Sequence, residues 1–374
     1  MKILMRLLIA SLFLIPADAL AEKTSENDER LRRSLLKFPQ ADSDANGILT
    51  QTEAAAFQRQ RRSNRQAPKH IAPTPTHEDV QYGPYNRNVY DIWLPETDEP
   101  TALIIQVHGG GFRGGDKSRI RAQKTVQNVL DAGLAFASIN YRFAYTSPAD
   151  IDNPQKTSIQ NVLRDSARAL QHIRSNAADY NIDKKRIGMY GGSAGAGTSL
   201  FIGFHDDLAD PDNEDPVLRE STRLAVVGML NGQFSYDLES WDPAFKKRYG
   251  DDTKPYGEIR GSGGDFSGFY GLTTEAYAGA KGQAARADVD MLNHISDDDP
   301  AVFILCTNPA LQPLTVGELQ HDPLHAELIE ARAKQHGLDV LTLLTKVRPE
   351  DKEKGSRTQE VLLDFLLKHL DDGE

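Results

Sequence analysis

The chain has 374 residues, of which 39% are hydrophobic and 26% charged, and its formal net charge is −11. Because binding to nucleic acid phosphates requires a basic surface, this acidic balance argues against a nucleic-acid partner. Cys306 is the only cysteine, which excludes an internal disulfide bond and a thiolate metal cluster.

Residues 1–21 have the pattern of a secretory signal peptide. Lys2 and Arg6 precede a short apolar stretch at 7–15, and Ala-Leu-Ala at 19–21 follows as a small-x-small cleavage site. The apolar stretch is too short to span a bilayer, and no later segment is suited to do so. We therefore expect a secreted or periplasmic protein, not an integral membrane protein, whose mature chain starts after Ala21.

Residues 25–63 are predicted to form two helices separated by an acidic loop, DSDANGILTQTE at 42–53. The loop matches every fixed position of an EF-hand, including Gly47 at the sharp turn. The expected oxygen ligands of Ca²⁺ are Asp42, Asp44, Asn46, Ile48 through its carbonyl, Thr50 and Glu53. EF-hands usually occur in pairs, so a single loop favours a structural calcium site of modest affinity over a sensor.

The polar, proline-containing segment 64–80 is expected to be a linker, and residues 81–374 a separate α/β domain. In that domain, apolar runs such as NVYDIWLP, ALIIQV, LAVVGML and AVFILC alternate with amphipathic helical patterns, including a helix expected at 117–131. This alternation predicts a mostly parallel sheet with helices on both faces. The segment 241–290 has weak periodicity and is expected to form a cap-like insertion.

A nucleophile motif occupies residues 189–197, MYGGSAGAG, where Gly191, Ser193 and Gly195 form Gly-x-Ser-x-Gly. A predicted strand precedes Ser193 and a predicted helix follows it, which is the setting of a strained turn that exposes a reactive hydroxyl. The two glycines avoid collisions in so tight a turn. Ala194 then offers its backbone N–H at the helix start as a donor to an oxyanion.

A second motif, HGGGF at 108–112, also follows a predicted strand. Such a loop supplies further backbone N–H donors to the oxyanion in lipases and esterases, and we assign that role to Gly110 and Gly111. His108 is expected to brace the loop rather than act as a base.

HGGGFRGGDKS and YGGSAGAG resemble motifs of the acetyl-esterase and hormone-sensitive-lipase-like branch of the α/β-hydrolases, and of feruloyl and acetyl-xylan esterases. MLNHISDDDPAVFIL, at 291–305, also resembles the segment that leads into this family's seventh strand, so the resemblance covers about residues 85–370. It implies an α/β-hydrolase fold behind the small helical EF-hand module. It also implies ester hydrolysis through a Ser–His–Asp triad, with no cofactor for catalysis.

Both partners of the serine are missing from the positions where this family has them. The family's acid follows the strand that AVFILC matches, but here TNPALQPLTVGE follows, and its first carboxylate is Glu318. The family's histidine lies in the loop after the last strand, but KVRPEDKEKGSRTQ contains none.

The segment ELQHDPLHAEL, at 318–328, offers the best alternative because it lies near the carboxyl end of a strand, where sites gather in parallel sheets. We favour His321 as the base, with His325 as the alternative. Asp237, Glu318 and Asp322 are all candidates for the acid, and Asp237, after the sixth strand, is the one we assign. The remaining histidines after Ser193 are interpreted as structural or surface residues: His205, His294, His336 and His369.

These patterns favour a secreted serine esterase that acts on a small ester or an acylated carbohydrate, such as acetyl or feruloyl groups on a polysaccharide. The missing family residues motivate a second hypothesis, a non-catalytic binding or scaffold protein with the same fold. A serine peptidase is less favoured, because the chain has no propeller or comparable accessory domain.

Overall fold

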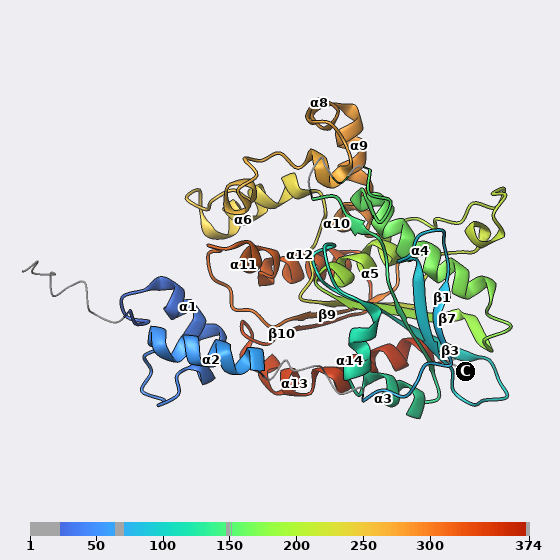
Figure 1. Ribbon diagram of the computed structural model, residues 1–374, viewed down its shortest axis with the longest axis horizontal. Helices are drawn as coiled ribbons and strands as arrows, with labels where there is room; N and C mark the ends of the chain where they lie inside the picture. The colour runs from blue at the N-terminus through green and yellow to red at the C-terminus, as the bar shows by residue number, and fades with distance from the viewer. Residues whose placement is uncertain (1–22, 64–70, 147–149, 151, 372–374) are drawn as a thin grey trace, which may run out of the picture. The chain divides into compact units, whose positions relative to one another are not determined.

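The computed structural model describes residues 23–63, 71–146, 150 and 152–371 (Figure 1). The signal peptide predicted at 1–21 lies outside these ranges, as do residues 64–70 of the predicted linker. The chain divides into two compact units, residues 1–68 and 69–374. No helix within the described ranges is long and apolar enough to cross a membrane.

In the smaller unit, two helices flank the acidic loop. Helix α1 spans Glu29–Lys37, the short helix η2 spans Pro39–Ala41, and α2 spans Gln51–Ser63. A short antiparallel bridge joins Thr24 to Thr50, and the Ser25 N–H donates to the Leu49 carbonyl at 2.8 Å. Because Leu49 is fully buried, this bridge and the small apolar core together fix the second half of the loop.

The larger unit is built on an eight-stranded sheet with the order β1-β2-β4-β3-β7-β8-β9-β10. The strands of the sheet are β1 His77–Gln81, β2 Val89–Trp93, β3 Thr101–Val107, β4 Ala135–Ile139, β7 Ile182–Gly192, β8 Val226–Leu230, β9 Ala301–Cys306 and β10 Val340–Leu344. Strand β2 pairs antiparallel with β1 and β4, and all other pairs are parallel. A separate parallel pair consists of β5 Phe143–Ala144 and β6 Lys156–Thr157.

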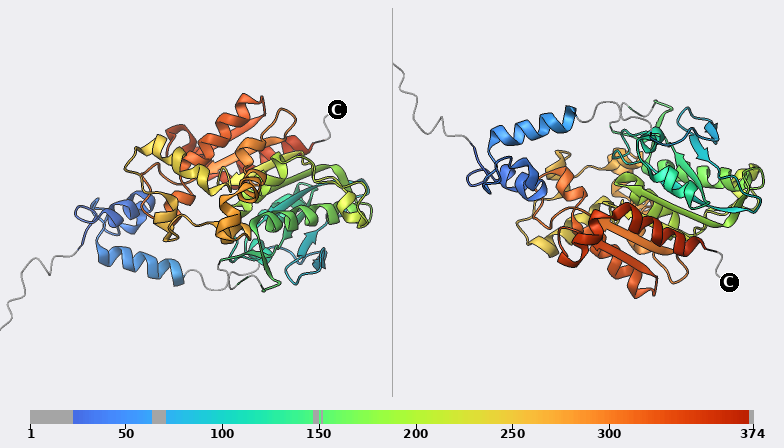
Figure 2. Two further views of the ribbon diagram at one scale, coloured as in Figure 1. Left: turned by 90° about the horizontal axis from the view of Figure 1, so that it is seen from above. Right: turned by 90° about the horizontal axis from the view of Figure 1, so that it is seen from below.

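Helices cover both faces of the sheet, as the alternating sequence pattern predicts (Figures 1 and 2). The helices before the insertion are η3 Lys117–Ala122, α3 Thr125–Asp131, α4 Ile159–Ser175, α5 Ala194–Phe204, η5 Pro216–Arg219 and η6 Leu238–Ser240. Those after it are α10 Met291–His294, α11 Val316–Gln320, α12 Pro323–Gln335, η8 Pro349–Asp351, α13 Lys352–Ser356 and α14 Thr358–Leu370. The single helix expected at 117–131 is thus two shorter pieces.

Strand β3 shows how each face of the sheet packs into its own core cluster. Leu103, Ile105 and Val107 pack in the cluster that contains side chains of α4, α5 and α12. Ala102 and Ile104 pack in the cluster that contains side chains of α3 and α14. Successive side chains of a strand point to opposite faces, so a strand covered on both sides reads as a continuous apolar run.

The linker expected at 64–80 is shorter in the structure, because His77–Gln81 forms β1. The N–H groups of Ile71 and Ala72 also donate to the Arg121 carbonyl, at 2.7 and 2.9 Å. The chain therefore joins the larger unit ten residues before the boundary that composition indicated. Polar sequence hid this edge strand, in which no side chain is fully buried.

The insertion between β8 and β9 consists of short helices, which lie in the upper part of Figure 1. They are α6 Trp241–Tyr249, α7 Tyr256–Arg260, η7 Ser267–Tyr270, α8 Thr274–Ala278 and α9 Ala280–Asp288. Trp241, Tyr256 and Phe269 from this insertion line the cavity that contains Ser193. The insertion therefore contributes directly to the candidate site.

Candidate active site

Ser193 stands at the turn between β7 and α5. Its φ of 54° and ψ of −118° are unusual for a residue with a side chain, and such a conformation costs about 1–3 kcal/mol. The Ser193 N–H is held by the Leu230 carbonyl of the neighbouring strand β8 at 2.9 Å. Strand pairing therefore imposes the strained turn that presents the hydroxyl.

The glycines of the motif are required by close backbone approach. A Cβ atom on Gly191 would lie 2.3 Å from the backbone carbon of Gly195. A Cβ atom on Gly195 would lie 2.1 Å from the carbonyl oxygen of Val107, at the end of β3. These approaches let α5 start directly against the sheet, and they leave no room for any larger residue.

His321 lies within hydrogen-bonding distance of the nucleophile. Its Nε2 is 2.9 Å from Ser193 Oγ, so the pairing expected from sequence is present in the structure. On the other side of the ring, His321 Nδ1 is 2.9 Å from the Gly317 carbonyl oxygen. A carbonyl can only accept, so Nδ1 carries the proton and Nε2 is the acceptor that a general base requires.

Asp237 is not the partner of His321, contrary to our assignment. Its carboxylate accepts from the Glu239 N–H at 3.1 Å, as the N-cap of η6, and lies 3.5 Å from Arg286 Nε. Burial raises the pKa of Asp237. The loop after β8 turns this side chain toward the insertion, where it pairs with α9.

The other two acid candidates are engaged at helix starts. Glu318 forms a capping box with Thr315 at the start of α11. Asp322 caps α12 through the Leu324 N–H at 2.8 Å and accepts from the Tyr249 hydroxyl at 2.7 Å. Burial raises the pKa of Asp322 to about 6, and this carboxylate is bound by Leu324 and Tyr249 and not by the His321 ring.

His325 has a structural role. Its Nε2–H donates to the Leu319 carbonyl at 2.9 Å, and its Nδ1 accepts from the Phe234 N–H at 3.4 Å. The ring is fully buried, and burial lowers its pKa to about 3. His325 thus joins the turn before α12 to the loop after β8 as a neutral residue, and it is not available as the base.

The expected oxyanion donors lie around Ser193. Among the described residues, no acceptor is found for the N–H groups of Gly110, Gly111 and Ala194. Gly111 and Ala194 line the same cavity as Ser193. Gly110 has a φ of 136°, and a Cβ atom there would lie 2.0 Å from the Gly114 carbonyl oxygen, so the loop can close only on glycine.

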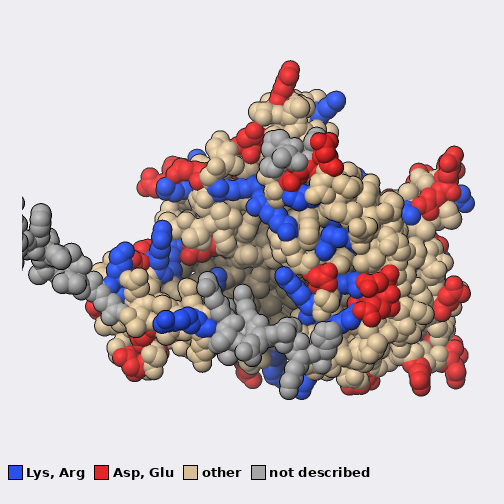
Figure 3. All heavy atoms as spheres, viewed as in Figure 1, with Lys and Arg blue, Asp and Glu red and all other residues tan. Residues whose placement is uncertain are grey.

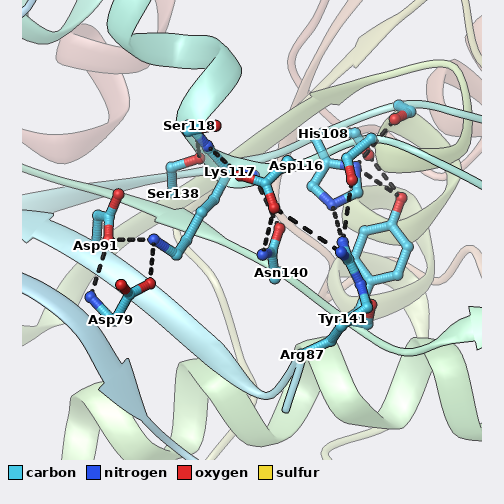
Figure 4. Close-up of polar contacts among 12 residues, drawn as sticks. Asp79, Arg87, Asp91, His108, Asp116, Lys117, Ser118, Ser138, Asn140 and Tyr141 are labelled. Atoms are coloured by element: carbon cyan, nitrogen blue, oxygen red, sulfur yellow. Dashed lines mark hydrogen bonds and ion pairs between the residues drawn. The ribbon is translucent and has the colours of Figure 1, made fainter. Parts of the chain in front are cut away.

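His108 braces this loop from behind, as Figure 4 shows. Its Nδ1–H donates to the Gly109 carbonyl at 2.9 Å, and its Nε2 is 3.3 Å from Arg87 Nη2. The ring stacks on Tyr141, whose hydroxyl donates to the His108 carbonyl at 2.7 Å. Burial lowers the pKa of His108 to about 4, so the brace is neutral and is not a base for Ser193.

Ser193 opens into a cavity of about 290 Å³. It is lined by Gly111, Phe112, Arg113, Ser193, Ala194, Gln233, Tyr236, Leu238, Trp241, Tyr256, Arg260, Phe269, Val316 and Gln320. Five of the lining side chains are aromatic, and five others are polar or charged. A small acyl group or one sugar ring fits a space of this kind.

The acidic loop of the smaller unit has ligand atoms that converge. One oxygen from each of Asp42, Asp44 and Glu53 lies within 4.8 Å of the other two. Asp42 Oδ1 is buried and has no hydrogen-bond partner, while Oδ2 accepts from the Gly47 N–H at 2.8 Å. The Thr50 and Ser43 donors lower the pKa of Glu53 to about 2. Three converging carboxylates with one unpaired buried oxygen fit a hard cation such as Ca²⁺.

Solved structures with the same fold cover most of the chain. A truncated form of a carbohydrate esterase from gut microbiota aligns with a TM-score of 0.54 at 17% identity, over 81% of this chain and 98% of that one. The apo form of Thermogutta terrifontis esterase 2 aligns with a TM-score of 0.52 at 16% identity, over 79% of this chain and 96% of that one. The larger unit therefore has the α/β-hydrolase fold.

Part of the same unit is similar in sequence to esterases. Residues 90–254 match the BD-FAE family model. Esterase LipQ of Mycobacterium tuberculosis is 34% identical over 167 residues, which are 43% of this chain and 35% of that protein. A probable isoprenylcysteine alpha-carbonyl methylesterase of Arabidopsis thaliana is 24% identical over 157 residues, 42% of this chain and 30% of that protein. This chain thus spans about a third of the length of these relatives.

Sequence reasoning missed the Gly317 carbonyl, the cavity aromatics of the insertion, and Gln233, whose Nε2 donates to the Gln320 carbonyl at 2.6 Å. Every residue has a backbone carbonyl, so no side-chain pattern in the sequence could have identified Gly317 as the acceptor. The density of aromatic residues in 241–290 was a usable signal for the aromatic side chains that the insertion contributes to the cavity.

Proposed function

We propose that the protein is a serine carboxylic-ester hydrolase that forms an acyl-enzyme on Ser193. The proposal rests on one observation above all, the 2.9 Å contact between Ser193 Oγ and His321 Nε2. This contact lies beside a cavity lined by aromatic and polar side chains, where the N–H groups of Gly111 and Ala194 have no acceptor among the described residues. A hydroxyl, a correctly protonated imidazole and an oxyanion site are the parts that acyl transfer needs.

In the first half-reaction, Ser193 Oγ attacks the ester carbonyl carbon while His321 Nε2 takes the hydroxyl proton. The N–H groups of Gly110, Gly111 and Ala194 stabilise the negative charge on the carbonyl oxygen. The protonated Nε2 then gives its proton to the departing alkoxide as the ester C–O bond breaks. Water repeats these steps on the acyl-enzyme, and the acid leaves.

Gly317 takes the place of the triad acid in this scheme. Its carbonyl fixes the tautomer and the orientation of His321, which are two of the three functions of the acid. A neutral carbonyl stabilises the imidazolium less than a carboxylate does. We therefore propose a serine–histidine pair oriented by the main chain, with the carbonyl as the group behind the ring.

We further propose an acylated carbohydrate as the substrate. One protein of similar structure is a carbohydrate esterase, and another is a bifunctional GH43-CE of Bacteroides eggerthii. The second aligns over 79% of this chain and 35% of its own, with a TM-score of 0.55 at 17% identity. The faces of Trp241 and Tyr256 in the cavity support the same idea, since flat aromatic rings offer large apolar contact area.

Labelling with a fluorophosphonate probe tests the reaction. Wild type should be labelled and should hydrolyse p-nitrophenyl acetate, and Ser193→Ala should do neither. His321→Ala should abolish both, whereas His336→Ala, which removes a histidine at the far end of α12, should not. An unlabelled wild type with no turnover would favour the non-catalytic alternative, for which the lack of an acid directly after the AVFILC strand in the sequence is the supporting observation.

We also propose that the loop 42–53 holds one structural Ca²⁺. Asp42, Asp44 and Glu53 would supply carboxylate oxygens, and Asn46, Ile48 and Thr50 the remaining ligands named from sequence. Calorimetric titration with Ca²⁺ should give heat for wild type and for Asp98→Ala, a variant at an exposed aspartate of the other unit. Asp42→Ala should give none, and equal heats for Asp42→Ala and wild type would contradict the proposal.

Finally, we propose that the chain is exported and cleaved after Ala21. The support is the n-region, apolar stretch and cleavage pattern in the sequence. N-terminal sequencing of protein from the periplasm or medium should start at Glu22. Intact Met1 on active protein in the cytosol would contradict export.

A further inference from the structure

Two arginines beside Ser193 lack the partners that arginines of this unit usually have. Arg113 directly follows Phe112 of the oxyanion loop, and Arg260 ends α7 of the insertion. Both line the cavity that contains Ser193. Among the described residues, neither guanidinium group forms a hydrogen bond or an ion pair, and Arg260 only lies over the Phe266 ring at 5.9 Å.

Most other arginines that the structure describes in the hydrolase are paired, although Arg119 and Arg332 are not. Arg142 Nη2 lies 2.7 Å from Asp165 Oδ1, and Arg248 Nη1 lies 2.6 Å from Glu327 Oε2. In Figure 3, basic and acidic side chains lie next to one another at several places on the visible face. In a chain with a net charge of −11, two unpaired arginines at one cavity are therefore unusual.

The cavity itself contains no compensating charge. None of its fourteen lining residues is Asp or Glu. Partial burial and the charge of Arg260 lower the pKa of Arg113, as expected of two cations that lie near each other without an anion between them. Such an arrangement is unfavourable in the free protein, and a bound anion would relieve it.

The two arginines also stand where two cavities meet. A second cavity of about 690 Å³ shares Arg113, Arg260 and Phe269 with the first, and it continues along the glycine-rich stretch 261–274. A substrate whose ester carbonyl lies at Ser193 would therefore pass the two guanidinium groups as it extends into the second cavity.

We propose that this esterase prefers substrates with a carboxylate close to the ester, and that Arg113 and Arg260 bind that carboxylate. The inference rests on the proposed esterase function and narrows its substrate class to acidic esters. Guanidinium groups match the planar geometry of a carboxylate, and each can donate two parallel N–H bonds to it. The carboxylate belongs either to the acyl group or to the alcohol, and matched substrates separate the two.

For the alcohol side, 3-acetoxybenzoate is compared with 3-acetoxybenzamide, which has the same shape and no charge. For the acyl side, monoethyl adipate is compared with its primary amide. In wild type, kcat/KM for the anion should exceed that for the amide by about 10-fold in at least one pair, because a charge-assisted bond is lost in the amide. Raising KCl from about 0.05 to 0.5 M should shrink this ratio, since salt screens a partly exposed contact.

In the variants, the measured quantity is the ratio of kcat/KM for the anionic ester to kcat/KM for its amide. It should fall to about 1–2 in the double variant Arg113→Gln/Arg260→Gln, with intermediate values for the single variants. It should stay at the wild-type value in Lys254→Gln, which removes a basic side chain of the same insertion that pairs with Glu258 at 2.6 Å.

A wild type that hydrolyses the amides as fast as the anions would overturn the inference and leave the esterase function standing. So would a preference for anions that the double variant retains. If no ester is hydrolysed and Ser193 is not labelled, both the proposed function and this inference fail together.

Discussion

The replacement of Asp237 by Asn distinguishes a carbonyl-oriented histidine from a conventional triad. In a Ser–His–Asp triad, Asp→Asn lowers kcat about 10⁴-fold, which is about 5 kcal/mol of transition-state stabilisation. In this structure the Asp237 carboxylate contacts the Glu239 N–H and, at 3.5 Å, Arg286 Nε. Asn retains the cap, and only the partly exposed ion pair is lost, which is worth about 0.5–1 kcal/mol of stability.

We therefore expect Asp237→Asn to keep kcat for p-nitrophenyl acetate within about threefold of wild type, because no contact of the base changes. His321→Ala, assayed in parallel, sets the lower limit of the measurement, and thermal unfolding confirms that Asp237→Asn is folded. A loss of about 10³-fold or more at an unchanged melting temperature would refute the reasoning, since it would place Asp237 behind His321 during turnover.

Three further predictions follow from local geometry. Gly195→Ala should lower the free energy of unfolding by about 3 kcal/mol, because the added Cβ would lie 2.1 Å from the Val107 carbonyl oxygen. Gly192→Ala is the control: its Cβ would have its nearest neighbour at 3.9 Å, so this variant should unfold near the wild-type temperature. Thr315→Val should lower kcat about three- to fivefold, because it removes the cap that holds the start of α11 and with it the Gly317 carbonyl. Thr315→Ser keeps the cap and serves as the control. Equal kcat values for Thr315→Val and wild type would contradict the role of that carbonyl. The pKa of Asp322 is raised to about 6, so the folded state keeps a proton between about pH 4 and 6 that the unfolded state has lost, and stability falls as pH rises through this window. Melting temperatures of Asp322→Asn relative to wild type should therefore rise from pH 4.5 to 7.5, and a constant difference would disprove the buried, raised pKa.

The sequence predicted those parts of the molecule that depend on side-chain pattern. Continuous apolar runs identified the buried strands, and strand–turn–helix context located Ser193. The position of His321 shortly after β9 was enough to predict its pairing with Ser193, because parallel strands end at one edge of the sheet.

The parts that failed depend on contacts that no local pattern encodes. Asp237 follows a strand at the correct edge, but Arg286 from α9 draws it toward the insertion, and that pairing spans a region of weak periodicity. Strand β1 is polar and mostly exposed, so its composition is typical of a linker although it pairs with β2.

Gly317 has a consequence for how sequences of this kind are judged. A search that requires an acid at the family position would score this chain as an inactive descendant, although its histidine already has an acceptor behind it. That acceptor belongs to the main chain, so no single side-chain exchange can delete it, and only a change in the path of α11 can move it. Inactivity is therefore a question for the backbone around residue 317, and a missing aspartate alone does not answer it.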